Sequence, residues 1–391
     1  MRVLGLALFL AGFSLWKPLA AAPMITVGNA VYFHVKADAE YQYLSNLTLS
    51  TDPNLVKDDS LFKFTPGLRL SLFEESDLTH FSFGVERSLL HFLTETFFND
   101  EPWRLNMRAG YDGHPFSFST GWNKAEMLQN ISTASGFSSI RSNSEIVRTI
   151  AEQFNINFKF SFTQKTGMRT GLDWSVTDFT NPTYLDYDAT SVPLSVFYKF
   201  TEKLESSIGY RYRFTEISSG TEHRDHYLNL KLLGHVTPKT DLQLTLGFQN
   251  RNSDYFGNPQ SLDTNAFSAN LGVNYQATGK IGLSAGLFRD FNIGSSLGET
   301  IEYTSANVGS NIQISPTFSF AGTASVWKAD YSVITREDFG VNGRAGFTFA
   351  PTDSVWTFRT GYNFDWAEFD IFNSITEYTN HKVSLSTNWE Y

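Results

Sequence analysis

The sequence has no cysteine among its 391 residues, which excludes a disulfide framework, a thiolate metal site and a cysteine nucleophile. It also lacks a glycine-rich phosphate loop, and beyond residue 22 no apolar run approaches the roughly 20 residues of a membrane-spanning helix. The 40 acidic residues outnumber the 30 basic ones, and the net charge of -10 disfavours binding to nucleic acid. The chain can therefore meet a membrane only through strands.

Aromatic residues are abundant, with 36 Phe, 17 Tyr and 8 Trp, yet the mean hydropathy is only -0.23. The apolar side chains are spread thinly over almost the entire length, in alternation with polar ones. A transmembrane barrel requires this distribution, because its outer face contacts lipid while its lumen is wet.

Residues 1–22 are typical of a signal peptide. Arg2 supplies the positive start, residues 3–16 form an apolar run, and residues 19–22 offer small side chains for cleavage. The sequence therefore predicts export, followed by a single domain over residues 23–391.

Short turn signals recur along the chain, centred near residues 165, 202, 239, 279, 316 and 353, with earlier ones at 74–77 and 112–115. Each interval holds two alternating segments of about ten residues, the length that a tilted strand needs to cross a bilayer. A propeller blade would place four shorter strands in that interval. The pattern predicts an all-β, antiparallel, up-and-down transmembrane barrel of about 18 strands, or 16 with one hairpin fewer. Short turns and both termini would face the periplasm, and longer loops would face outward.

One connection is longer than the others. Residues 124–152 are expected to form the third outer loop, with a short helix over residues 144–153. Such a loop either folds into the lumen or forms a surface insertion, and the sequence does not decide between the two.

Strand parity assigns the side chains to two faces, because successive residues of a strand point in opposite directions. On this basis an inward basic set is expected to line the pore: Lys36, Lys63, Arg69, Arg104, Arg108, Lys159, Arg169, Lys199, Arg211, Arg213, Lys231, Arg344, Arg359 and Lys382. The inward acids are fewer: Asp38, Glu40, Glu86, Asp173, Glu205, Asp365 and Glu390. The remaining acidity is expected in loops at residues 178–188, 216–225 and 365–377. Such a lumen either attracts anions or is braced by Arg–Glu pairs.

Enzymatic constellations are sparse. Residues 222–226, Glu-His-Arg-Asp-His, are a possible metal cluster, but a solvated outer loop is the better interpretation. No Ser and His residues pair convincingly on the outer face. We expect no enzyme, and no catalytic, cofactor or metal site.

The last strand, residues 378–391, runs to an aromatic terminal residue. Its apolar face, formed by Val383, Leu385, Trp389 and Tyr391, is expected to close the barrel against the first strand at residues 35–43. This ending resembles the C-terminal signature of bacterial outer-membrane barrels.

The start of the chain resembles the porin-2 type of β-barrel outer-membrane protein. Residues 39–46, Ala-Glu-Tyr-Gln-Tyr-Leu-Ser-Asn, and residues 58–68, Asp-Asp-Ser-Leu-Phe-Lys-Phe-Thr-Pro-Gly-Leu, carry this resemblance. It implies a Gram-negative outer-membrane protein often associated with exopolysaccharide gene clusters. Outer-membrane lipids, lipopolysaccharide and the barrel-assembly machinery are then the expected partners.

The favoured function is an outer-membrane porin for transport of hydrophilic solutes, with anionic solutes or acidic (exo)polysaccharide or oligosaccharide as the leading hypothesis. The alternatives are a structural or adhesive barrel that conducts nothing, and, less favoured, an enzyme embedded in the barrel.

Overall fold

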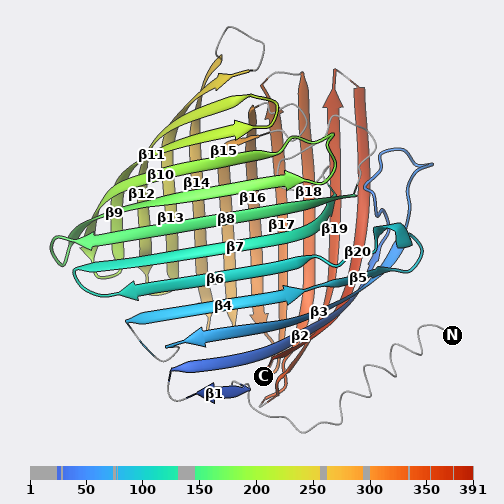
Figure 1. The fold of residues 1–391 in the computed structure, drawn as a ribbon, viewed down its shortest axis with the longest axis horizontal. Coiled ribbons are helices and arrows are strands. Elements are labelled where there is room, and N and C mark those ends of the chain that lie inside the picture. Colours follow the sequence, from blue (N-terminus) through green and yellow to red (C-terminus); the bar gives the residue numbers. More distant parts are fainter. Residues whose placement is uncertain are drawn as a thin grey trace.

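The computed structural model is an all-β, closed, antiparallel barrel of 18 strands (Figure 1). It describes residues 24–27, 30–73, 76, 78–130, 146–255, 262–293, 300–332, 335–352, 354–372 and 374–390. The predicted signal peptide lies outside the described residues. Within the described ranges, no helix has the length and apolar character needed to span a membrane.

The first strands of the wall are interrupted, and the later ones are long. The early elements are β1 (Ile25–Val27), β2 (Val31–Leu44), β3 (Asp59–Leu72), β4 (Thr79–Arg87), β5 (Leu89–Phe92), a 3-10 helix η2 (Thr96–Phe98), β6 (Trp103–Asp112), β7 (Phe116–Asn130) and β8 (Ile146–Ser161). The later ones are β9 (Thr166–Phe179), β10 (Tyr187–Thr201), β11 (Leu204–Ile217), β12 (Glu222–Thr237), β13 (Thr240–Asp254), β14 (Leu262–Thr278), β15 (Ile281–Ile293), β16 (Thr300–Gln313), β17 (Phe318–Tyr331), β18 (Arg336–Phe349), β19 (Trp356–Ile371) and β20 (Ser374–Glu390). Since β4 and β5 both pair with β3, they act as one strand of the wall, while β1 only extends the sheet beside β2.

The barrel closes where β2 pairs with β20, seen in Figure 1 as the blue strand beside the red one. Tyr43 lies opposite Val383, Tyr41 opposite Leu385 and Ala37 opposite Trp389. The predicted closure is therefore confirmed, and no strand edge is left open there. Tyr391 lies outside the described residues.

Each of the eight predicted turn positions falls between two consecutive wall strands of the described chain, but the strands are longer than predicted. From β7 to β20 they contain 13 to 17 residues, against an expectation of about ten for crossing the bilayer alone. The extra residues lie at the end opposite the tight turns, which we call the long-loop end.

The predicted loop at residues 124–152 is wrong in its bounds. Strand β7 continues to Asn130 and β8 begins at Ile146, so residues 146–153 are strand and not the expected helix. Charge pairing extends the sheet here, because Arg148 on β8 bonds Glu126 on β7 at 2.5 Å. Residues 131–145, on which the lumen-or-surface alternative rests, lie outside the described residues.

The acidic loops at 178–188, 216–225 and 365–377 are likewise partly strand. The ends of β9 and β19 and the starts of β10, β12 and β20 occupy much of these ranges. Partners on the same and neighbouring strands stabilise the charges in them, as where Arg224 on β12 bonds Glu222 on β12 and Asp254 on β13.

Two faces of the wall alternate along each strand. One face is apolar and exposed, for example at Val192, Leu194 and Val196, which are 44%, 45% and 56% exposed. The other is polar and faces the lumen, because Arg211 on β11 and Asp290 on β15 approach to 4.0 Å although β12, β13 and β14 separate their strands. Such a contact can only be made through the inside of the barrel.

Small apolar clusters lie inside the long-loop end. Leu49, in the connection between β2 and β3, packs against Ala367, Phe369 and Tyr378 on the lumenal face of β19 and β20. The backbone amide of Asn46, in the same connection, donates to Asn380 Oδ1 on β20 at 3.1 Å. This connection therefore lies over the inner wall.

Candidate functional site

The candidate site is the lumenal wall, and the cross-strand register locates the basic residues on it. Lys159 lies opposite Arg169, and Arg169 lies opposite Ser195, so their side chains share one face. Following the pairs around the wall, the same face carries Lys36, Lys63, Arg69, Arg104, Arg108, Lys159, Arg169, Lys199, Arg211, Arg213, Lys231, Arg344, Arg359 and Lys382. The register places them at every height between the tight turns and the long loops.

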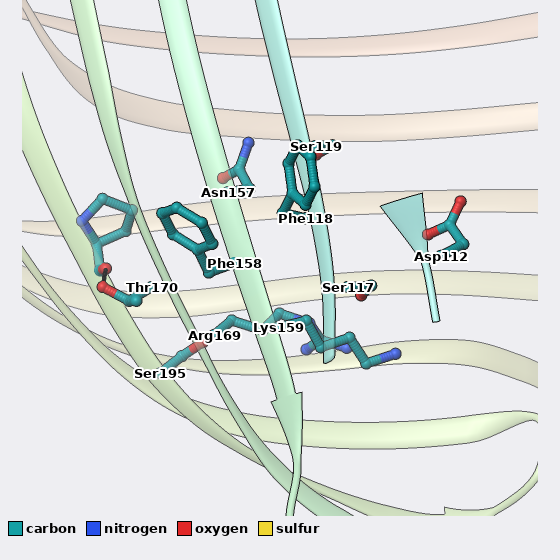
Figure 2. A pocket seen from close by; sticks show the side chains of 11 residues that line it. Asp112, Ser117, Phe118, Ser119, Asn157, Phe158, Lys159, Arg169, Thr170 and Ser195 are labelled. Carbon is teal, nitrogen blue, oxygen red and sulfur yellow. Dashed lines mark hydrogen bonds between the residues drawn. The ribbon is translucent and has the colours of Figure 1, made fainter. Parts of the chain in front are cut away.

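A cavity of about 360 Å³ lies in this wall over β6 to β10 (Figure 2). Lys159 and Arg169 project into it beside Asn157, Ser117 and Ser195, as the close-up shows. Asp112 lies in the same lining and adds a carboxylate. The cavity thus combines two cationic groups and one acid with neutral hydrogen-bonding groups, which suits a solute carrying both a charged group and hydroxyls.

The two cations of this cavity differ in their partners. Arg169 makes a two-point ion pair with Glu205, at 2.6 and 2.9 Å. The ammonium of Lys159 lies 5.5 Å from the centre of the Phe197 ring, and no carboxylate of the described residues pairs with it. Lys159 is therefore not held in an ion pair, although Glu205 and Asp112 act on it electrostatically at longer range.

A second basic group lies elsewhere on the wall, contributed by β3, β18 and β20. Lys382 interacts electrostatically with Lys63 and Arg344, and also with Glu40 and Asp365. The two acids lie near the three bases, but no base comes within 4.0 Å of a carboxylate among the described residues. The group therefore presents a net positive surface to the lumen.

Across the lumenal face, some bases are paired and others are not. Lys36 bonds Glu86 at 2.5 Å, and Arg213 Nε donates to Asp225 Oδ2 at 2.6 Å. In the described ranges, the lumenal bases without any ion pair are Lys63, Arg108, Lys159, Lys199, Lys231, Arg344, Arg359 and Lys382. The wall is thus braced in part by ion pairs and carries uncompensated positive charge elsewhere.

Sequence reasoning missed a buried ion cluster on β11, β12 and β13. Asp225 accepts two bonds from Arg251, at 2.6 and 2.9 Å, and Asp225 and Arg251 are fully buried. Arg213 bonds the same carboxylate. A sequence signal for this cluster was present. Polar residues continue the period of two beyond the apolar segments of the three strands, at positions 211, 213, 223, 225, 249 and 251.

The possible metal cluster at residues 222–226 is not a loop, because β12 begins at Glu222. Alternation sends His223 and Asp225 to the lumenal face and Arg224 and His226 to the outer face. The guanidinium groups of Arg213 and Arg251 occupy the Asp225 carboxylate. No group of acidic and histidine residues suited to a metal ion occurs in the part of the chain that the structure describes.

The structure does bring one Ser and one His together. His223 Nδ1 lies 2.7 Å from Ser253 Oγ, but both residues are completely buried. A serine nucleophile must reach its substrate, and this pair instead joins β12 to β13 inside the wall.

The fold is similar to that of solved outer-membrane proteins. OccK2 (OpdF) of Pseudomonas aeruginosa, solved in complex with glucuronate, superposes with a TM-score of 0.53 at 11% identity, covering 92% of this chain and 98% of that one. The outer membrane protein OpdK of the same organism gives 0.50 at 11% identity, with 92% and 99% covered. OccAB3 of Acinetobacter baumannii gives 0.50 at 9% identity, with 92% and 99% covered.

These likenesses establish the shared barrel fold. No protein-family model matches the sequence, and no curated protein matches it.

Proposed function

We propose that this protein is an outer-membrane channel that passes hydrophilic solutes and prefers anions. The observation that carries the proposal is the set of lumenal bases without a carboxylate partner, headed by Lys159 and the group of Lys63, Arg344 and Lys382. Positive charge in a narrow channel with low-dielectric walls raises the local concentration of anions and lowers that of cations.

The solute class that fits best is an acidic sugar or oligosaccharide. Arginine offers paired donors to a carboxylate, while Asn157, Ser117 and Ser195 in the cavity beside Arg169 suit hydroxyl groups. The similar OccK2 barrel was solved with glucuronate, a sugar acid. The resemblance of residues 39–68 to porin-2 barrels points to the same class, through the exopolysaccharide clusters associated with them.

The surroundings follow from the two faces of the wall. Outer-membrane lipids, including lipopolysaccharide, would cover the exposed apolar belt that includes Val192, Leu194 and Val196. With the tight turns facing the periplasm, both ends of the chain lie there too, and export through residues 1–22 would deliver the chain to the barrel-assembly machinery.

A non-conducting structural or adhesive barrel is the second candidate. The packing of Leu49 against Ala367, Phe369 and Tyr378 favours it, because this connection occupies part of the long-loop end. The unpaired lumenal bases argue against this candidate, because they would have no role in a filled lumen.

Liposome swelling with solutes of matched size tests the proposal. Glucuronate, glucose and glucosamine differ mainly in charge, so we expect swelling rates to fall in that order in liposomes containing the purified protein. Absence of swelling with all three would establish the non-conducting barrel. Fastest entry of glucosamine would exclude an anion preference.

A further inference from the structure

Three aromatic side chains form a shelf on the lumenal wall of β15, β16 and β17. Phe288 and Trp327 both lie opposite Ser305 in the register, and Tyr303 is two residues from Ser305 on the same face. The Tyr303 and Trp327 rings are nearly parallel, at 24°, with centres 6.1 Å apart, and Phe288 follows at 6.3 Å from Tyr303. All three are partly exposed.

The Trp327 ring lies flat against β18. A Cβ atom added to Gly340, its partner in the register, would stand 2.4 Å from the indole Cε2 and 2.5 Å from Nε1. Glycine is thus required at residue 340 for the indole to rest on the backbone. Trp327 also packs against the cluster of Leu49, Ala367, Phe369 and Tyr378, so the ring is covered in part and remains half-buried.

Other lumenal aromatics also lie on glycine, but cations cover them. Arg169 stands 4.3 Å from the centre of the Phe197 ring, and Arg211 stands 4.6 Å from that of Tyr227. No cation lies over Tyr303 or Trp327 among the residues that the structure describes. The shelf therefore keeps a partly exposed aromatic surface that no cation of the described residues covers.

Polar and then basic rows follow the shelf toward the tight turns. The first row contains Asn342, whose Nδ2 donates to Asp365 Oδ1 at 2.6 Å. The next contains Arg344 and, two strands away, Lys382. At 3.3 Å per residue, Gly340 and Arg344 are about 13 Å apart along β18, which is longer than one sugar ring.

We infer that this wall is a track for an acidic oligosaccharide of at least two linked sugars. The apolar C–H face of one ring stacks on Tyr303 and Trp327, hydroxyls bond Asn342 and Asp365, and a carboxylate farther along pairs with Arg344 and Lys382. The inference rests on the proposed channel function and deepens it. It distinguishes a carbohydrate from a small carboxylate, which needs no aromatic surface.

Packing alone is the competing explanation of the shelf. Tyr303 and Trp327 contact the buried cluster of Ile301, Ala329 and Tyr331, and Trp327 also contacts the cluster around Leu49. In this explanation the rings serve only to stabilise the wall. The two explanations differ in whether removing an aromatic surface changes sugar binding without changing the channel itself.

Current block by trigalacturonate through single channels in planar bilayers separates them. We expect the wild-type protein to bind trigalacturonate more tightly than monomeric galacturonate. Trp327→Leu should weaken trigalacturonate binding by about two- to tenfold, the value of one aromatic contact. Trp327→Phe should restore most of the binding, and Trp174→Leu, on the outer face, should leave it unchanged. The reversal potential in a KCl gradient should be the same in all of these variants.

A second variant on another strand, Tyr303→Leu, guards against a Trp327→Leu chain that fails to fold. Unchanged trigalacturonate binding in a folded Trp327→Leu or Tyr303→Leu channel would overturn the track. Equal binding of trigalacturonate and galacturonate by the wild-type channel would also overturn the track. If the reversal potential were anion-selective in that case, the channel proposal would still stand. A cation-selective wild-type channel would overturn the proposed function itself.

Discussion

Arg169 on β9 and Glu205 on β11 form a two-point ion pair across the lumenal face, at 2.6 and 2.9 Å, although β10 lies between their strands. Lys159, opposite Arg169 in the register, has no such partner in the described chain. Glu205 therefore neutralises Arg169 directly, whereas Lys159 interacts with Glu205 and Asp112 only at longer range and forms no ion pair. The local charge of the cavity in Figure 2 depends on this arrangement.

Glu205→Gln should raise the anion preference of the channel. The substitution releases Arg169 and adds one net positive charge near the tight turns, which should increase the chloride-to-potassium permeability ratio about two- to fivefold. Because the pair is partly exposed, the stability cost should be at most about 1 kcal/mol. Glu216→Gln, on the outer face, is the matched control. A ratio that falls or stays constant in Glu205→Gln would contradict the proposed role of these charges.

Asp225→Asn should destabilise the barrel strongly. It leaves the fully buried Arg251 without its carboxylate, which costs about 3–5 kcal/mol in comparable buried pairs. The loss of stability should appear as a lower unfolding temperature in detergent, measured by heat-dependent gel migration. Glu222→Gln removes an acid from the same strand at the exposed outer face and should change the temperature little. Equal effects of the two substitutions would show that the cluster is not a stabilising element.

Removal of residues 389–391 should hinder assembly in the membrane. Trp389 lies opposite Ala37 in the closing pair of β20 and β2, so truncation shortens the seam that closes the barrel. The fraction of the protein that is inserted in the membrane and resists heat should fall. Membrane fractionation and gel migration measure this fraction. Trp389→Phe keeps the chain length and the aromatic group and should assemble normally. Full insertion of the truncated chain would contradict this role of the terminal strand.

Leu49→Asp should raise single-channel conductance. A carboxylate cannot remain in the apolar cluster with Ala367, Phe369 and Tyr378, so this connection should leave the long-loop end of the lumen. Leu55→Asp changes an exposed residue of the same connection, 45% accessible, and serves as the control. A conductance that rises equally in both variants would show that the Leu49 contact does not narrow the channel.

The sequence predicted the architecture because alternation is a local property. The turns near residues 165 and 202, the strand count and the β2–β20 seam all follow from period two together with the requirement that a barrel leave no edge. The lumenal assignment of Lys159 or Arg344 follows from the same parity and needs no knowledge of the partners.

Contacts between distant residues were beyond such reasoning. The segment at 222–226 resembled a solvated loop because it is highly charged, but Arg213 and Arg251 on the neighbouring strands stabilise Asp225 there. Likewise, the pairing of Arg169 with Glu205 and the flat contact of Trp327 with Gly340 depend on the register between strands. Only the structure identifies which bases are compensated and which remain free.

The reversal potential of the purified wild-type protein in a KCl gradient across a planar bilayer tests the central claim most directly. A lumen with uncompensated bases should bring this potential toward the chloride equilibrium value, and the triple variant Lys63→Gln, Arg344→Gln, Lys382→Gln should bring it back toward zero. A wild-type potential near the potassium equilibrium value would contradict the account.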